Sequence, residues 1–398
     1  MDKRVINGKR NAAGVVTTAA LVTIFAYAFI LAPSHTLINE VVAEFSLEGA
    51  GQGLMSNLLS VGFMLSLFII PVMQGRAQKL TLIIAASVLQ AVMLAAGGAS
   101  PTFFLFGTSC VILGFSGGFI DTYCNSAVVD VRKTESSRYL GYMHGLFGVG
   151  SLIAPFLFIW LLRSMQWRGI FYILAGISAA TALFVAIAAR GKAGKDSAPT
   201  ISEHLFKKTD LMDYLRKKRN LALVLACFFS TVAQGGVMAW IVRYMTLRFD
   251  AADLGALSFS IFWVCATVNR FGFAQFVKNA PMKFFALGSV LHCVLLTVGV
   301  YSASPVVLCV MIGALGLIGG HFFPVLISEF AKGYEGRTSF TTSVMMFIAS
   351  ISRIVAPVLI AYTSSSISLT FGILIPAAAA LLAAVSGWLA SQTNASHT

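Results

Sequence analysis

Charged residues are scarce in this sequence. Asp, Glu, Lys and Arg make up 11% of the 398 residues, whereas hydrophobic residues make up 58%. Soluble globular domains carry about 25% charged residues, so the composition excludes that class. Apolar stretches of about 20 residues recur along the chain, each long enough to cross a ~30 Å hydrocarbon core as a helix. The sequence therefore predicts an all-α integral membrane protein.

Cysteine is also scarce, and the motifs of several enzyme classes are missing. The 6 cysteines form no Cys-x-x-Cys pair and show no metal-ligand spacing, so we expect neither disulfides nor a zinc site. The chain has no Gly-x-x-x-x-Gly-Lys-Ser/Thr loop and no His-Glu-x-x-His motif. These absences argue against ATP-driven transport and intramembrane hydrolysis. We expect no enzyme activity and no cofactor, with an ion gradient as the energy source.

The apolar stretches fall into two sets of six, separated by one long polar segment. The predicted spans lie near residues 17–39, 51–73, 80–99, 103–129, 139–162 and 168–189, then 220–246, 253–277, 281–301, 304–331, 338–362 and 367–390. We therefore predict an N-terminal six-helix bundle over 1–189, a cytoplasmic linker over 190–219 and a C-terminal six-helix bundle over 220–398. Within the linker, leucines at 205, 211 and 215 predict a short helix on the membrane surface.

The two sets of spans resemble each other in sequence. A shift of 202 residues places Leu113-Gly114 on Leu315-Gly316, Ser87-Val88-Leu89 on Ser289-Val290-Leu291 and Pro155 on Pro357. The register stays free of gaps across four successive spans, which indicates an internal repeat. Two similar halves are typical of a solute carrier that rocks about a central site.

The net charge of +13 reflects membrane orientation rather than nucleic-acid binding. The 28 Lys and Arg residues lie at the N-terminus and on that side of the membrane, except Arg163, Arg168, Arg243, Arg248 and Arg353. By the positive-inside rule both termini and the linker are cytoplasmic. We expect a monomer in the lipid bilayer, in a bacterial cytoplasmic (inner) membrane, with no nucleic-acid partner.

Asp121 is the sharpest functional signal, because it lies well inside the fourth predicted span. A carboxylate there costs about 3 kcal/mol or more to insert unless it faces a cavity, a cation or a proton. We interpret Asp121 as a proton carrier; a permanent structural ion pair is the alternative. Asn125, one turn away on the same helix face, is positioned to hydrogen-bond a polar solute.

Four histidines also lie within spans: His35, His144, His292 and His321. A histidine near its neutral pKa serves as a proton relay or a solute ligand, but an intramembrane histidine is often only a packing residue. His35 follows a proline and His144 lies in a glycine-rich span, and both settings favour a cavity wall. We therefore assign His35 to proton coupling and His144 and His321 to solute binding, with weaker support for His321.

Arg353 and Arg270 are the candidate intramembrane cations. Arg353 lies about two-thirds of the way through the eleventh predicted span, where it needs a carboxylate, backbone carbonyls or an anionic ligand. Pairing with Asp121 and binding an acidic substrate group are both open. Arg270, in the inner third of the eighth span, either binds solute or extends its charged end to the cytoplasmic surface.

Twelve spans in two repeats with a basic central loop resemble the major facilitator superfamily over essentially the whole chain. The resemblance implies two pseudo-symmetric six-helix bundles, the major facilitator fold. The superfamily signature between spans 2 and 3, Gly-x-x-x-Asp-Arg-x-Gly-Arg-Arg, is degenerate here. The segment from Gln74 to Lys79 keeps basic charge but lacks the Asp, which puts an inner gate built on that Asp in doubt.

Three segments resemble the fucose/proton symporter family and related sugar transporters. Gly117, Asp121 and Asn125 fit the fourth-span pattern Gly-x-x-x-acid-x-x-x-Asn. The seventh-span spacing of acid, Trp and Tyr is kept by Gln234, Trp240 and Tyr244, with an amide replacing the acid, and the stretch from Met143 to Gly150 resembles the fifth-span motif. This resemblance assigns Gln234 and Trp240 to solute binding.

The sequence departs from that family at two places. His35 stands at about the position of the family's first-span Asp, so a two-acid arrangement is reduced to Asp121 and a histidine. Arg353 has no expected counterpart, and paired cations in spans 8 and 11 resemble the oxalate/formate antiporter family instead.

Three functional hypotheses follow. The first is a proton-coupled secondary transporter that moves a small polar solute, a sugar or sugar-like molecule, by alternating access. The second is an organic-anion antiporter or exporter that uses Arg270 and Arg353. The third is a non-transporting membrane sensor or scaffold.

Overall fold

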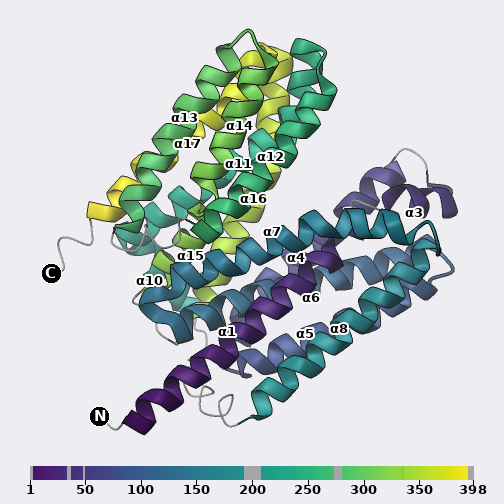
Figure 1. Cartoon of the computed structure of the whole chain (residues 1–398). Coiled ribbons are helices and arrows are strands. Elements are labelled where there is room, and N and C mark those ends of the chain that lie inside the picture. Colours follow the sequence, from purple (N-terminus) through teal and green to yellow (C-terminus); the bar gives the residue numbers. More distant parts are fainter. Residues whose placement is uncertain are drawn as a thin grey trace. The chain divides into compact units, whose positions relative to one another are not determined.

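The computed structural model describes residues 3–33, 37–47, 50–191, 208–272, 280–332, 334 and 336–392, and every regular element among them is helical (Figure 1). The first half contains α1 (Lys3–Leu31), α3 (Ile38–Glu44), α4 (Ala50–Met73), α5 (Lys79–Ala99), α6 (Phe103–Arg132), the 3₁₀ turn η1 (Lys133–Glu135), α7 (Ser136–Leu161) and α8 (Trp167–Arg190). The second half contains α10 (Lys208–Arg216), α11 (Lys218–Phe249), α12 (Ala252–Gly272), α13 (Pro281–Tyr301), α14 (Pro305–Gly319), α15 (Phe322–Ala331), α16 (Thr338–Ser366) and α17 (Leu369–Gln392). The expected all-helical fold is confirmed.

By length and composition, 10 helical stretches among the described residues are suited to cross a membrane. One of them, Phe103–Leu161, contains both α6 and α7, which are separated only by the turn η1. The apolar segment Leu58–Met73 of α4 is shorter than the others. These stretches correspond to the predicted series of spans.

Two of the predicted spans differ from the helices in the structure. The span expected over 304–331 is broken: α14 ends at Gly319 and α15 begins at Phe322. Two adjacent glycines at the break lower the helix propensity there. The first span was expected to run to residue 39, but α1 ends at Leu31, two residues before Pro33, because the residue before a proline disfavours helical dihedrals.

The chain divides into two compact units. The first comprises Met1–Tyr139, Leu146–Phe206 and Gly333–Ser343, and the second comprises Leu140–Gly145, Lys207–Lys332 and Val344–Thr398. Each unit therefore contains most of one half of the sequence and a short segment from the other half. The predicted boundaries at 190 and 219 stay a prediction.

Equivalent helix pairs pack in the same way in the two halves. The pair α4 and α6 corresponds to α12 and α14, and both pairs make extensive contacts. An added Cβ at Gly114 would lie 1.9 Å from the Leu59 carbonyl oxygen, and one at Gly316 would lie 2.2 Å from the Phe262 carbonyl oxygen. Only glycine permits so close an approach of two helices. The 202-residue repeat therefore has a direct structural counterpart.

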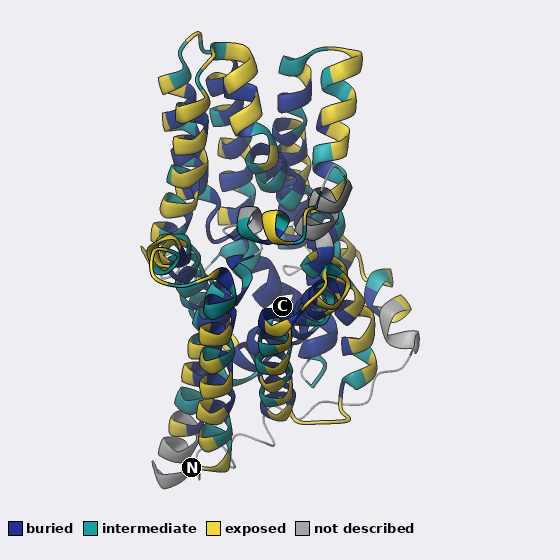
Figure 2. Ribbon diagram, turned by 90° about the vertical axis from the view of Figure 1, so that its right-hand side faces the viewer, coloured by how far each residue is buried: buried dark blue, intermediate teal, exposed yellow. Residues whose placement is uncertain are grey.

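Side chains on the helix surfaces are largely apolar. Figure 2 shows exposed residues in yellow along one side of many helices and buried residues in dark blue on the other. Phe156 is 71% exposed, Leu183 62% and Val385 55%. A soluble monomer rarely exposes such extended apolar surface, so these faces are suited to contact lipid.

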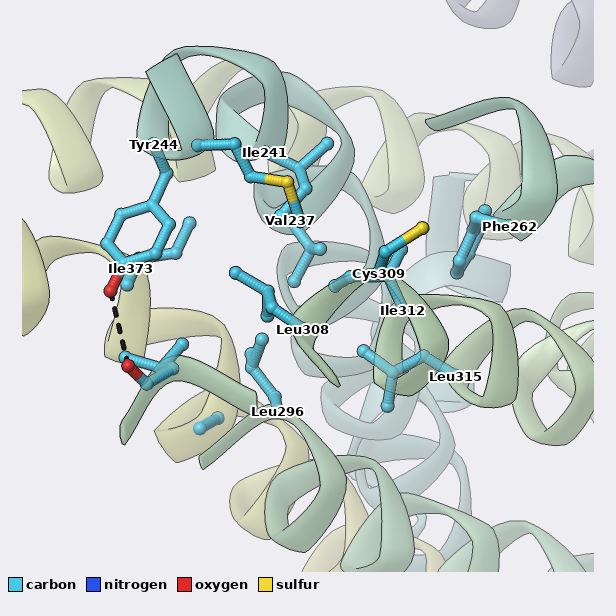
Figure 3. Close-up of a cluster of buried hydrophobic side chains, with 13 residues drawn as sticks. Val237, Ile241, Tyr244, Phe262, Leu296, Leu308, Cys309, Ile312, Leu315 and Ile373 are labelled. Atoms are coloured by element: carbon cyan, nitrogen blue, oxygen red, sulfur yellow. Dashed lines mark hydrogen bonds between the residues drawn. The ribbon is translucent and has the colours of Figure 1, made fainter. Parts of the chain in front are cut away.

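The core of the second unit is a cluster of aliphatic and aromatic side chains from several helices. Figure 3 shows it between α11, α12, α13, α14 and α17, with Val237, Leu308 and Ile312 near its centre. At one edge the buried Tyr244 hydroxyl donates to the Val300 carbonyl oxygen at 3.4 Å. This core holds α11 and α14, the two helices that carry Gln234 and the helix break.

Candidate functional site

Asp121 and Asn125 form a hydrogen-bonded pair on α6 of the first unit. The Asn125 Nδ2 donates to Asp121 Oδ1 at 2.8 Å and to the Asp121 backbone oxygen at 2.7 Å. Asn125 is fully buried and Asp121 is half-buried. The amide therefore fixes the orientation of the carboxyl group. In this arrangement Asn125 positions Asp121, and a contact between Asn125 and a solute stays a prediction.

A tyrosine from α1 packs close to the same part of α6. Tyr27 is 3% exposed, and its hydroxyl lies only 2.2 Å from the place that a Cβ on Gly117 would occupy. Gly117 is one turn before Asp121, so the absence of a side chain there lets Tyr27 reach α6. The glycine of the Gly-x-x-x-acid-x-x-x-Asn pattern thus has a packing role beside the carboxyl group.

Three backbone carbonyls at the break between α14 and α15 accept hydrogen bonds from side chains of other helices. The Leu317 oxygen accepts from Asn269 Nδ2 at 2.5 Å, and the Gly319 oxygen accepts from Gln234 Nε2 at 3.1 Å. The Gly320 oxygen accepts from Arg270 Nε at 3.0 Å. A broken helix inside a membrane requires such partners, because no water is present to satisfy the freed carbonyls.

His321 lies at this break and has a defined tautomer. Its Nδ1 is 3.1 Å from Asn269 Oδ1. Since Asn269 donates through Nδ2 to the Leu317 carbonyl, its Oδ1 is the acceptor and His321 Nδ1 carries the hydrogen. The Nε2 atom of His321 is buried and has no hydrogen-bond partner in the described part of the chain. His321 therefore presents a lone pair as an acceptor.

Arg270 also contacts His144, which belongs to the second unit through the segment Leu140–Gly145. Arg270 Nη1 donates to the His144 backbone oxygen at 3.1 Å. The His144 ring packs edge-on against Phe323 of α15, with ring centroids 5.8 Å apart. Four predicted site residues thus meet around one helix break: His144, Gln234, Arg270 and His321.

Trp240 and Arg353 lie elsewhere in the second unit. Trp240 is half-buried against the core shown in Figure 3, and the Arg243 guanidinium lies 5.6 Å from its ring centroid. Arg353 is an exposed residue of α16 whose Nε donates to the Ala349 oxygen at 3.3 Å. Asp121 belongs to the first unit, so its pairing with Arg353 stays a prediction. His35 lies outside the described residues.

The degenerate signature between α4 and α5 forms a polar cluster that the sequence analysis did not assign. Lys79 Nζ is 2.6 Å from Asp130 Oδ2, and both side chains are at most 5% exposed. Thr338 donates to Asp130 Oδ1 at 2.7 Å and also contacts Lys79. Gln74 Oε1 accepts from the Phe340 backbone N–H at 3.1 Å, in the first turn of α16. The amide of Gln74 therefore caps a helix N-terminus, a task for which the signature's Asp is suited.

The spacing of basic residues in the signature was the only sequence signal for this cluster. Asp130 and Thr338 stand far from Lys79 in the chain, and neither has a motif around it. All residues of the cluster lie in the first unit, which includes Gly333–Ser343.

Solved membrane transporters have the same fold. The fucose:proton symporter FucP of E. coli aligns with a TM-score of 0.73 and 18% identity over 96% of this chain and 98% of that chain. The human organic anion transporter TETRAN aligns with a TM-score of 0.70 and 15% identity over 96% of this chain and 99% of that one. The proton:xylose symporter XylE, solved with 6-bromo-6-deoxy-D-glucose, aligns with a TM-score of 0.67 and 14% identity over 96% of this chain and 95% of that one.

These alignments show that the chain has the fold of these solved transporters. The sequence model of the Major Facilitator Superfamily matches residues 14–357, so the chain belongs to that superfamily. No curated protein matches the sequence closely enough to support a relationship. The expected superfamily and its fold are confirmed.

Proposed function

We propose that this protein is a secondary active transporter that moves a small polar solute, a sugar or sugar-like molecule, by alternating access coupled to protons. The observation that carries the proposal is the Asp121–Asn125 pair inside α6. A carboxyl group at that depth in a span needs a functional or structural reason, because inserting its charge costs about 3 kcal/mol or more.

The surroundings of Asp121 suit a group that gains and loses a proton. The hydrogen bond from Asn125 Nδ2 favours the ionised carboxylate. The apolar interior of a span favours the neutral form. We propose that a change in solvent access during the transport cycle changes the proton occupancy of Asp121. We propose that His35, at about the place of the first-span acid in the fucose/proton symporter family, assists this step.

We propose that the solute-binding residues are polar side chains on the membrane-spanning helices. Asn125 stands beside the proton carrier, while His144, Gln234, Arg270 and His321 surround the helix break in the second unit. Trp240 offers an aromatic face suited to a sugar ring. The structural likeness to FucP and XylE, both named as proton symporters of sugars, supports the choice of solute class.

Replacing the proton carrier tests this proposal. In proteoliposomes, Asp121→Asn should abolish solute accumulation driven by an inward proton gradient, while exchange of labelled for unlabelled solute persists. Asp253→Asn, the same chemical change at an exposed position of α12, is the matched control and should accumulate solute normally. Undiminished gradient-driven accumulation by Asp121→Asn would refute the proton-carrier role.

A second candidate function is the exchange or export of an organic anion. Arg270 forms no ion pair with the described residues; it donates to two backbone oxygens, and its guanidinium lies 6.0 Å from the Trp263 ring centroid. The likeness to TETRAN, named as an organic anion transporter, also favours this reading. A thermal-shift screen against sugars and carboxylates, repeated on Arg353→Gln, separates the two. Sugar hits that the substitution leaves unchanged would exclude the anion reading.

The same transport assay also tests whether the protein is a non-transporting sensor or scaffold. Ligand binding without any flux in proteoliposomes would favour a sensor or scaffold instead.

We also propose a monomer in a bacterial cytoplasmic membrane with both termini in the cytoplasm, as the distribution of Lys and Arg indicates. Protease accessibility of terminal tags in inverted vesicles, but not in intact spheroplasts, is the expected result.

A further inference from the structure

A buried polar residue recurs at the same place in the third span of each half. The segments Ser87-Val88-Leu89-Gln90 and Ser289-Val290-Leu291-His292 coincide in the 202-residue repeat. Gln90 of α5 and His292 of α13 are each 1% exposed. Gln90 and His292 are not among the proposed solute-binding or proton-coupling residues. Each half thus has a buried polar residue at the same position of the repeat, and this residue is distinct from the proposed proton carrier Asp121.

The polar atoms at these positions have no hydrogen-bond partner within the described residues. Both Gln90 Nε2 and Gln90 Oε1 are buried and unpaired, and so are both ring nitrogens of His292. Ser87, one turn from Gln90 on the same face of α5, also has an unpaired buried Oγ. Leaving a buried polar group unpaired destabilises the folded state, so five such atoms at two related positions require an explanation.

The helices packed against these positions offer small side chains. In the first half, α8 packs along α5, and Ser178 Oγ donates to the Ser87 carbonyl oxygen at 2.8 Å. In the second half, α17 packs along α13, where Phe285 contacts Gly387. The helices α13 and α17 run antiparallel. His292 lies two turns after Phe285 on α13, and Ala380 lies two turns before Gly387 on α17, so His292 and Ala380 lie at the same level.

The alanines of α17 explain why His292 has no side-chain partner. Ala377, Ala379 and Ala380 are all buried, and alanine carries no donor or acceptor. Ser178, which the repeat places on Ala380, donates its hydroxyl to the Ser87 carbonyl oxygen and not to the Gln90 amide.

We propose that each of the two positions binds internal water, one site at Ser87 and Gln90 and one at His292. The chemistry of the unpaired atoms selects this ligand. A cation would satisfy Gln90 Oε1 but not the Nε2 donor, and an anion would satisfy only the donor. Water donates and accepts, so it satisfies both. The neutral imidazole of His292 likewise has one donor and one acceptor nitrogen.

Internal water at these places agrees with the general occupancy of protein interiors. Globular proteins hold about one buried water for every 27 residues, typically bound by two to four otherwise unsatisfied polar groups. The Ser87–Gln90 site supplies three such atoms, whereas the two ring nitrogens of His292 point away from each other, so each binds a separate water. The two sites duplicate because the helix packing that creates them is duplicated.

A density map of the full chain in lipid nanodiscs, at a resolution that shows ordered water, tests the proposal directly. We expect a peak within hydrogen-bonding distance of both Ser87 Oγ and the Gln90 amide, and a second peak beside a ring nitrogen of His292. Absence of both peaks overturns the proposal. Peaks that grow when sodium is replaced by rubidium also overturn it, because they mark a cation.

A thermal double-mutant cycle provides an independent test. If one water bridges the pair, Ser87→Ala and Gln90→Met each lower the midpoint of thermal unfolding, and the double variant loses less than the two single shifts combined. Val92→Met, on the exposed face of the same helix, is the matched control and should leave the midpoint unchanged. A midpoint raised by Gln90→Met shows that the amide was truly unpaired and overturns the proposal.

Discussion

The acidic residues of this chain differ in the partners that their carboxyl groups find. Asp130 contacts the ammonium of Lys79, and Glu329 contacts both Arg219 and Lys332. Asp121 accepts a hydrogen bond from the amide of Asn125 within the membrane-spanning helix α6. This placement is the residue-level basis for proposing Asp121 as the proton carrier.

The buried pair of Lys79 and Asp130 should be sensitive to the loss of one partner. Lys79→Met leaves a buried carboxylate without its cation, so we expect a loss of about 3–5 kcal/mol of stability. Thermal unfolding in detergent measures it. The double variant Lys79→Met with Asp130→Leu should recover much of the loss, since no charge is then left unpaired.

An exposed ion pair is the control for this prediction. Arg216 and Asp213 are 3.9 Å apart and 75% and 67% exposed, and such pairs contribute about 0–1 kcal/mol. If Arg216→Ala destabilised the protein as much as Lys79→Met, burial would not be the cause.

The contacts of Glu44, at the end of α3, predict that the stability of the folded protein depends on pH. Arg168 Nη2 lies 2.6 Å from Glu44 Oε1, and Trp167 also donates to this carboxylate at 2.5 Å. The hydrogen bond from Arg168 lowers the pKa of Glu44 below its ordinary value of 4.5, although partial desolvation opposes the shift. Because the pKa is lower in the folded state, the pair stabilises the protein above the unfolded-state pKa and loses this effect as pH falls through the folded-state value.

The effect of Glu44 should be small and confined to acidic pH. Its side chain is 40% exposed, so solvent screening limits its contribution to about 1 kcal/mol or less. We expect Glu44→Gln to lower the thermal midpoint slightly at neutral pH, with the difference from the parent shrinking as the pH drops below about 4.5. A difference that stays constant down to pH 3 would contradict the assignment.

At the scale of elements, the break between α14 and α15 depends on donors from neighbouring helices. Gln234 of α11 and both Asn269 and Arg270 of α12 donate to its carbonyl oxygens. In each of these hydrogen bonds a side chain of α11 or α12 donates to a backbone oxygen at the break. The bonds therefore link α11 and α12 to the segment that joins α14 and α15. Discontinuous helices of this kind are common at the substrate sites of secondary transporters.

Removing one of these donors should loosen the break. Asn269→Leu unpairs the Leu317 oxygen and the Nδ1 of His321, so we expect a loss of about 1–3 kcal/mol. Amide hydrogen exchange around residues 319–322 should rise more than exchange in the core of Figure 3. Ser260→Ala, on an exposed face of the same helix, is the control. Equal protection in Asn269→Leu and the parent would show that the bond is not needed.

At the scale of the whole molecule, the two halves share the positions at which helices pack closely but not the positions of charged residues. Gly114 and Gly316 occupy equivalent positions and permit equivalent helix contacts. In contrast, the 202-residue register places Asp121 on Phe323 and Arg353 on Ser151. Each half therefore uses the same helix packing to hold different side-chain chemistry.

The equivalent glycines should be equally intolerant of a methyl group. An added Cβ would approach backbone oxygens to 1.9 Å at Gly114 and 2.2 Å at Gly316, so either Ala variant must separate two helices. We expect each to lose folded protein on size exclusion and to lower the thermal midpoint, by roughly 1–3 kcal/mol or more in stability.

A helical glycine in open space is the control for these two variants. Gly176 of α8 has no atom within 4 Å of an added Cβ. Gly176→Ala should be neutral or stabilising by about 0.5–1 kcal/mol, because alanine favours the helix. Similar losses at all three glycines would argue against close helix approach as the reason.

The sequence alone determined the membrane class, the series of spans, the repeat and the superfamily. These properties can be predicted from short stretches of sequence, because hydropathy and helix periodicity depend on residues close together in the chain. Asp121 and Asn125 were also found in this way, since a helix places residues four apart on one face.

Only the tertiary structure decided the partners of the other polar groups. It assigned Arg270 and Gln234 to the carbonyls of a broken helix, Gln74 to the first turn of α16 and Lys79 to Asp130. None of these contacts could be predicted from spacing, because each joins segments far apart in the sequence. A hydrogen bond depends on the distance between two atoms, and the fold alone sets that distance for residues in different helices.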